Sequence, residues 1–250
     1  MDNLIFRCHN LASIMGASKG RITDKQVVEL KELNAKVKLT KKQQEKRDYL
    51  QAKLDNPSIF DLSAGAMSAV RDIVKQSKDV FDYNTQVTNN KLRKGIMCEK
   101  ASIKLFNEVF FTDFKKNEVR KSNEWISGEC DIEAPDTIYD IKTSWSKETF
   151  PMLPSEINIG AYEWQLRGYM MLYDKPKAAL VYCLVDTPCD LLDFENNMSI
   201  HHVEHIPPHL RVTVLYFKRD MAKEEFIKKK VVECRRYAKW YLEQIQAKNN

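Results

Sequence analysis

Hydrophobic and polar positions follow two different periods along the chain, and the period changes near residue 119. Before that point apolar residues recur at helical spacing, whereas within 119–144 they alternate with polar residues as in half-buried strands. The pattern predicts two helices within 24–55, one from 63 through 74 that ends by a polar loop around 84–90, and one at 94–111. It then predicts strands within 119–144, a helix at 161–173, strands at 178–185 and 211–217, and a closing helix at 221–246. This order predicts an α+β (α/β-type) fold with a central mixed β-sheet flanked by helices.

The N-terminal part of the chain differs from the remainder in composition. Residues 1–90 are predicted to form a helical region and residues 91–250 the sheet-containing core, within one structural domain overall. Residues 24–55 are strongly polar, and Thr40 is the expected cap of the second helix there, which indicates a solvated helical hairpin. Ser63 is the expected cap of the next helix. Such charged hairpins are usually exposed faces, and contact with DNA or a partner is the alternative.

Composition and charge limit the partners, the location and the metal sites that this chain can have. The formal net charge of +5 permits a nucleic-acid partner without requiring one, because 35 acidic residues accompany 40 basic ones. The absence of a long apolar run or of a secretory pattern predicts a soluble, intracellular protein with no membrane partner. The six cysteines are scattered, which argues against zinc-ribbon or iron–sulfur sites and predicts reduced, mostly buried thiols.

The candidate catalytic residues lie within residues 129–142. If the turn at 134–137 is symmetric, Asp131 lies opposite Asp140 and Glu129 opposite Lys142, all on one face. The other face is then apolar and contains Cys130, Ile132, Tyr139 and Ile141. Pro135 leaves an asymmetric loop, with the register shifted by one residue, as the alternative.

Two carboxylates that face each other repel unless a cation lies between them. Asp131 and Asp140 are therefore candidate ligands of Mg²⁺, with Mn²⁺ as a substitute, because these ions prefer carboxylate oxygens. Lys142 lies on the same side, where it could orient or deprotonate an attacking water and offset negative charge. The alternative is a solvent-facing hairpin whose acids pair with Lys142, and for an isolated acid-x-Lys pattern that alternative is the commoner case.

Two neighbouring helices carry further candidates. Glu99 lies among apolar positions expected to face the core, where an unpaired carboxylate is costly, so a metal site or a salt bridge would explain it. These apolar positions are Ile96, Ile103, Leu105, Phe106, Val109 and Phe110. On the following helix, Gln165 and Tyr169 are four residues apart and share a face, either toward the site or as an exposed pair.

Taken in order, these motifs resemble those of the PD-(D/E)xK nuclease superfamily. The nearest resemblance is to phage recombination nucleases of the lambda exonuclease and YqaJ group, which have a helix glutamate, Gly-x-x-Asp, acid-x-Lys and Gln-x-x-x-Tyr in this order. The matching segments are Gly95 with Glu99, residues 127–131, residues 140–142 and residues 165–169, within roughly 95–186. Cys130 stands where the group commonly has proline, and Asp140 is the shorter of the two acids it permits.

The resemblance implies a restriction-endonuclease-like core and a role for each matching residue. Asp131, Asp140 and the Ile141 carbonyl would bind the metal, with Glu99 supporting that site. Lys142 would act on the attacking water. Gln165 would support the catalytic strand, and Arg7 and Tyr169 are candidate substrate-binding residues.

The function that the resemblance implies is a magnesium-dependent deoxyribonuclease, in particular an exonuclease that resects double-stranded DNA ends for recombination. It also implies a homotrimer, a phage single-strand annealing protein as a candidate partner, and action in the cytoplasm of a bacterial host. One alternative is a structure- or site-specific endonuclease of the same fold. Another is a catalytically silent DNA-binding module, against which the intact Asp131, Asp140 and Lys142 argue.

Overall fold

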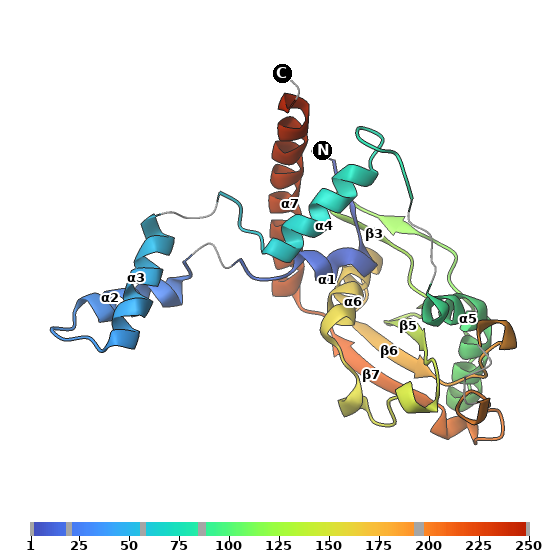
Figure 1. The fold of residues 1–250 in the computed structure, drawn as a ribbon. Helices are drawn as coiled ribbons and strands as arrows, with labels where there is room; N and C mark the ends of the chain where they lie inside the picture. The colour runs from blue at the N-terminus through green and yellow to red at the C-terminus, as the bar shows by residue number, and fades with distance from the viewer. Residues whose placement is uncertain (1–2, 19–21, 56–58, 85–88, 193–197, 249–250) are drawn as a thin grey trace. The chain divides into compact units, whose positions relative to one another are not determined.

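The computed structural model describes residues 3–18, 22–55, 59–84, 89–192 and 198–248, and its contacts divide the chain into two units (Figure 1). One unit contains residues 1–4, 13–82 and 228–250, and the other contains residues 5–12 and 83–227. This division changes at residue 83, whereas the sequence predicted a boundary between residues 90 and 91. Residues 5–12 group with the second unit, and the end of the last helix groups with the first.

The second unit is built on a four-stranded mixed sheet in the order β4-β5-β6-β7. Strands β5 and β6 are parallel, whereas β4 and β7 run antiparallel to their neighbours. The strands are β4 (Ile132–Glu133), β5 (Thr137–Thr143), β6 (Lys177–Cys183) and β7 (Val212–Lys218). Helix α6 (Gly160–Tyr173) lies in the connection between the two parallel strands. The predicted mixed sheet flanked by helices is therefore confirmed.

Different helices cover the two faces of this sheet. Helix α5 (Asn90–Phe110) packs against the face that carries Ile132, Tyr139 and Ile141, as predicted for the apolar side of the hairpin. Because successive strand residues point to opposite faces, Asp140 points to the other side, where α6 packs. The alternation predicted from the sequence thus separates Tyr139 and Ile141, which face the core with α5, from Asp140 and Lys142 on the opposite face of β5.

A second, three-stranded sheet in the order β1-β3-β2 lies against α6 in the same unit. Its strands are β1 (Phe6–Arg7), β2 (Lys121–Ser122) and β3 (Ile126–Gly128). The chain approaches Gly128 closely: a Cβ atom there would meet Tyr169 Cε1 at 2.7 Å and Cys8 Sγ at 2.8 Å. This contact explains the glycine of the Gly-x-x-Asp motif, because no side chain fits between β3, the segment after β1 and α6.

Replacing Gly128 by alanine is therefore expected to lower the free energy of unfolding by about 1–3 kcal/mol, the usual cost of overpacking. The matched control is Gly95→Ala, because a Cβ at this position in α5 would meet nothing within 4 Å. That control should raise stability by up to about 1 kcal/mol through helix propensity. Denaturant unfolding of both variants measures the two changes in the free energy of unfolding. Equal changes would contradict the close approach of the chain at Gly128.

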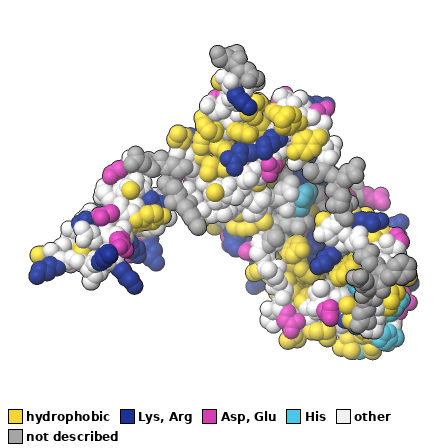
Figure 2. All heavy atoms as spheres, viewed as in Figure 1, with side chains coloured by type: hydrophobic (Ala, Val, Ile, Leu, Met, Phe, Trp, Pro, Cys, Tyr) yellow, Lys and Arg dark blue, Asp and Glu magenta, His cyan; other side chains and the backbone are white. Residues whose placement is uncertain are grey.

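The first unit is helical. It includes α2 (Asp24–Asn34), α3 (Lys41–Asp55) and α4 (Ala64–Gln76), while α1 (Leu11–Ile14) and α7 (Met221–Ala247) each extend across the division. Helices α2 and α3 form the predicted hairpin around Leu30, Leu33 and Leu50. Basic and acidic side chains are interspersed over it (Figure 2).

Both predicted helix caps are present. The hydroxyl of Thr40 accepts a hydrogen bond from the backbone N of Gln43 at 3.3 Å, and the Thr40 backbone N donates to Gln43 Oε1 at 3.0 Å. The Ser63 hydroxyl accepts from the backbone N of Ala66 at 3.1 Å. Short 3₁₀ helices complete the described chain at Cys8–Asn10, Lys147–Thr149, Pro154–Glu156, Cys189–Leu191, Met198–Ile200 and Pro208–Leu210.

All six cysteines are free thiols, and only Cys189 is exposed, in agreement with the predicted reduced and mostly buried state. Within the described residues, no helix is both long enough and apolar enough to span a membrane.

Candidate active site

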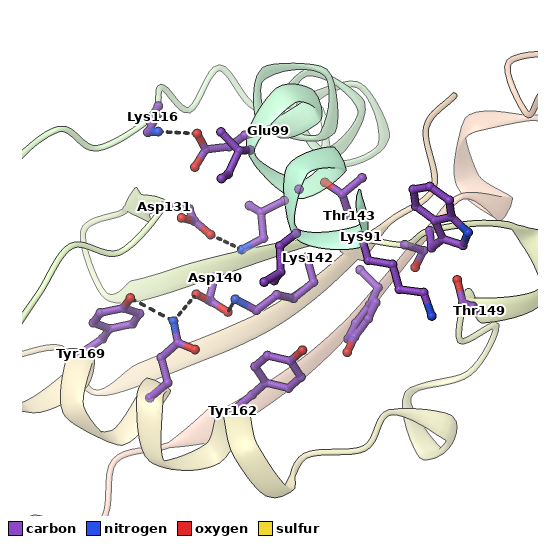
Figure 3. Close-up of a pocket in the computed structure, with 18 residues that line it drawn as sticks. Lys91, Glu99, Lys116, Asp131, Asp140, Lys142, Thr143, Thr149, Tyr162 and Tyr169 are labelled. Carbon is purple, nitrogen blue, oxygen red and sulfur yellow. Dashed lines mark hydrogen bonds and ion pairs between the residues drawn. The ribbon is translucent and has the colours of Figure 1, made fainter. Parts of the chain in front are cut away.

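The predicted catalytic residues line one cavity of about 620 Å³ in the second unit (Figure 3). Strand β5 and helices α5 and α6 supply most of its wall. The predicted residues that line it are Glu99, Asp131, Asp140, Ile141, Lys142, Gln165 and Tyr169. Arg7 lies instead at the end of β1, where its backbone is in register with Ser127 of β3.

Asp140 lies in the middle of β5 and is only 2% exposed. Its Oδ1 accepts a hydrogen bond from Gln165 Nε2 at 3.1 Å, and its Oδ2 lies 2.7 Å from Lys142 Nζ. Within the described chain, no donor reaches Oδ2 with good hydrogen-bond geometry, so the ion pair is its close polar contact. A buried carboxylate oxygen with unused acceptor capacity is suited to bind a further cation.

Asp131 directly precedes β4 and lies across from Asp140. Strands β4 and β5 pair Ile132 with Tyr139, so one further step along this register places the two acids opposite each other, as predicted. The Oδ2 of Asp131 accepts a hydrogen bond from the backbone N of Ile141 at 2.5 Å. Burial, and next the negative charge of Asp140, raise the pKa of Asp131 to about 7. A proton or a metal cation would relieve this repulsion.

The prediction for residues 129 and 130 is wrong. Strand β4 begins only at Ile132, because Asn117 binds the preceding backbone: its Nδ2 donates to the Cys130 carbonyl at 3.0 Å and its N to the Asp131 carbonyl at 2.8 Å. Glu129 does not face Lys142 but forms an ion pair with Arg120 at 3.6 Å. Cys130 is buried beside Asn117, outside the core that contains Ile132.

Lys142 lies beside Asp140 on the cavity side of β5, and its Nζ is 5.0 Å from the centre of the Tyr162 ring. Burial alone lowers the pKa of Lys142, but the negative charges of Asp140 and Asp131 outweigh this effect and raise it overall. Lys142 is therefore a cation held at the carboxylates. This arrangement favours orientation of a ligand and stabilisation of negative charge.

Gln165 and Tyr169 form the predicted pair on one face of α6. The amide Nε2 of Gln165 donates to Asp140 Oδ1 and also, at 3.0 Å, to the hydroxyl of Tyr169. Tyr169 is buried, and it contacts the segment at Gly128. Gln165 therefore fixes the orientation of Asp140, and Tyr169 holds Gln165 in place. Both residues are buried, so the alternative of an exposed helix pair does not apply.

Glu99 faces the cavity from α5, and its carboxylate forms an ion pair with Lys116 (Figure 3). The expectation that Ile96 and Phe110 face the core is wrong, since they are 67% and 41% exposed. The buried side of α5 instead contains Lys94, Cys98, Ser102, Ile103, Leu105 and Phe106. Glu99 lies at the border of this side, which is why it can reach both solvent and the cavity.

The donor set at the cavity fits a hard divalent cation. Within the described ranges, no three Asp, Glu, His or Cys side chains converge as metal ligands, so the protein side chains available are the two opposed carboxylates. Mg²⁺ commonly takes one or two carboxylates and keeps waters and phosphate oxygens as its other ligands. Asp131 and Asp140 therefore match its requirements, with Glu99 held by Lys116.

Sequence reasoning missed Lys94, which is fully buried in α5 beside the site. Its Nζ donates to the backbone carbonyls of Trp145 and Val185, each at 2.9 Å, and so joins α5 to the segments that follow β5 and β6. The available signal was its position four residues before Cys98, on the buried side of the helix.

Lys94 makes a testable contribution to the pH dependence of stability. Burial lowers its pKa to about 8, below the ordinary value of 10.5, so between these pH values the unfolded chain binds the additional proton. The contribution of Lys94 to the free energy of unfolding should therefore increase as the pH rises from 8 to 10.5. Denaturant unfolding of Lys94→Met and the parent protein across this range checks it, and parallel pH profiles would refute the assignment.

Comparison with known proteins bears on this geometry. No protein-family model and no curated protein sequence matches the chain. Among solved structures, it is similar to a phage-related exonuclease from Haemophilus somnus 129PT, with 27% identity, a TM-score of 0.76 and 97% of each chain covered. It also shares its fold with an alkaline exonuclease from Laribacter hongkongensis, with 13% identity, a TM-score of 0.54 and coverage of 92% and 93% of the two chains. These two similar structures are a phage-related exonuclease and an alkaline exonuclease, which matches the resemblance of the motifs to lambda-exonuclease-like phage recombination nucleases of the PD-(D/E)xK superfamily.

Proposed function

We propose that this protein is a divalent-metal-dependent exonuclease that hydrolyses phosphodiester bonds at the ends of double-stranded DNA. The observation that carries the proposal is the buried Asp140, with Asp131 across from it and Lys142 Nζ 2.7 Å from its carboxylate, at the wall of one cavity. DNA binding alone does not call for two opposed acids, because they would repel the phosphates. A hydrolytic centre does call for two opposed acids, because they would hold its metal ion.

Each residue of the site has a definite task in this proposal. Asp131 and Asp140 would hold Mg²⁺ or Mn²⁺, and the family resemblance adds the Ile141 carbonyl as a ligand. The ion, when bound, would supply positive charge for the scissile phosphate and the attacking water. Gln165 keeps the Asp140 carboxylate oriented through its hydrogen bond. Lys142 would orient the water and offset the negative charge that develops on the phosphate.

Exonuclease rather than endonuclease activity is favoured by the two similar solved structures, which are both described as exonucleases. Resection for recombination, a homotrimeric assembly and an annealing protein as partner follow from the family resemblance and belong to the proposal.

Activity is expected on linear duplex DNA with Mg²⁺ or Mn²⁺, and a chelator should abolish it because the proposed ligands are carboxylates. Ca²⁺ should bind without supporting turnover. The experiment follows release of nucleotides from a linear duplex, with a covalently closed circle of the same sequence as control. Cleavage of the circle would favour the endonuclease, and no Mg²⁺-dependent cleavage of either DNA would favour the silent binding module.

A further inference from the structure

The cavity continues past the carboxylates along the same face of β5. Strand alternation puts Asp140 and Lys142 on that face, and Ser144, the first residue after β5, continues the alternation; all three line the cavity. One two-residue step along a strand, about 6.6 Å, separates Lys142 from Ser144. This step is similar to the distance between consecutive phosphates in a nucleic-acid strand. The face can therefore present one group to each of two neighbouring phosphates.

Ser144 has a buried hydroxyl group that is available for a hydrogen bond to a ligand. The residue is 4% exposed, and its Oγ has no hydrogen-bond partner among the residues that the structure describes. The backbone of Ser144 is fixed by a hydrogen bond from its N to the Cys183 carbonyl at 2.9 Å. A buried hydroxyl without a partner is costly, so a donor in this position on a cavity wall is suited to an oxygen of a ligand.

Across the cavity, α5 begins with features that attract anions. Asn89 caps the helix by accepting a hydrogen bond from the Lys91 backbone N at 2.8 Å, and the positive end of the helix dipole lies there. The side chain of Lys91 is exposed and points toward Thr149 across the cavity (Figure 3). In the described part of the chain, no acidic side chain pairs with Lys91.

Lys94 holds these two parts of the wall together. Its ammonium group binds the carbonyl of Trp145, the residue that follows Ser144. Lys91 and Lys94 are three residues apart and so lie on the same side of α5. The hydrogen bond of Lys94 therefore directs the side of α5 that carries Lys91 toward the end of β5.

We propose that Ser144, Lys91 and the start of α5 form an anion subsite for the DNA phosphate next to the scissile phosphate in the same strand. This inference rests on the proposed nuclease function and adds a substrate contact to it. The subsite would fix the position of the strand at the carboxylates without taking part in bond cleavage. Its ligand is a phosphodiester, recognised by one ammonium group and one hydroxyl group.

The test uses the full chain with Ca²⁺ and duplexes that carry a single uncharged methylphosphonate at defined linkages near the end. For the parent protein, one linkage next to the scissile phosphate should be sensitive, with about tenfold weaker binding when its charge is removed. Lys91→Gln should weaken binding of the unmodified duplex by about tenfold and lower the salt slope by about 0.9. The methylphosphonate should not weaken DNA binding by the Lys91→Gln variant any further.

The matched control is Lys100→Gln, because Lys100 is an exposed lysine of α5 that does not line the cavity. This control should keep both the affinity and the sensitivity to the methylphosphonate. If Lys91→Gln keeps the full methylphosphonate effect, or behaves as Lys100→Gln does, the subsite is refuted. Absence of Mg²⁺-dependent cleavage by the parent protein would instead refute the proposed function.

Ser144→Ala provides a readout that does not depend on activity. Removal of a buried hydroxyl without a partner should raise the Tm of the DNA-free protein by about 2–4 °C and weaken binding of the unmodified duplex. A lower Tm would mean that the hydroxyl has a partner within the protein, and it would remove Ser144 from the subsite.

Discussion

Asp140→Asn is expected to reduce nucleotide release from linear duplex DNA by about 10³-fold or more, because it removes the charge of a buried metal ligand. Asp131→Asn should have a similar effect. Initial rates with saturating Mg²⁺ provide the measurement. The control is Glu129→Gln, a nearby acid that pairs with Arg120 and does not line the cavity, and its rate should stay near that of the parent protein.

The same substitution at Asp131 should stabilise the protein when metal is absent. The pKa of Asp131 is raised to about 7, so its ionised form is disfavoured in the folded state, and its contribution to stability is lost as the pH rises from about 4 to 7. At pH 8 in chelator, Asp131→Asn should raise the free energy of unfolding by about 1–3 kcal/mol. A loss of several kcal/mol would assign Asp131 to a structural hydrogen-bond network instead.

Lys142→Ala is expected to lower turnover at saturating DNA by about 10²–10⁴-fold, the scale of a positioned electrostatic or acid–base group. Affinity for DNA in Ca²⁺ should change little, since the ammonium of Lys142 is held by Asp140. Lys91→Gln is the contrasting variant, which should lower affinity and the salt slope while turnover at saturation is largely kept. Turnover of Lys142→Ala equal to that of the parent would exclude Lys142 from catalysis.

The hairpin that carries the site could be predicted because local rules determine it. The alternation of Ile132, Tyr139 and Ile141 with acidic positions gave both the apolar face and the register that brings Asp131 opposite Asp140. The prediction did not hold for Glu129, because Asn117, a residue distant in sequence, binds the chain before β4. Such a contact leaves no periodic signal.

Other features of the site depend on the tertiary structure alone. Lys116 lies 17 residues from Glu99, and nothing near either residue indicates their ion pair. Lys94 was assigned no role, because a lysine in a helix is ordinarily exposed, and its carbonyl partners lie 51 and 91 residues away. On α5, helical spacing alone did not reveal which apolar residues are buried, and so Ile96 was placed wrongly in the core.

Calorimetric titration of the DNA-free protein with Mn²⁺ measures whether the opposed carboxylates Asp131 and Asp140 form a metal site. We expect a binding signal for the parent protein and for Glu129→Gln, and at least about tenfold weaker binding when Asp131 or Asp140 is replaced by asparagine. Binding of equal strength in Asp140→Asn and in the parent protein would contradict a metal site at these carboxylates.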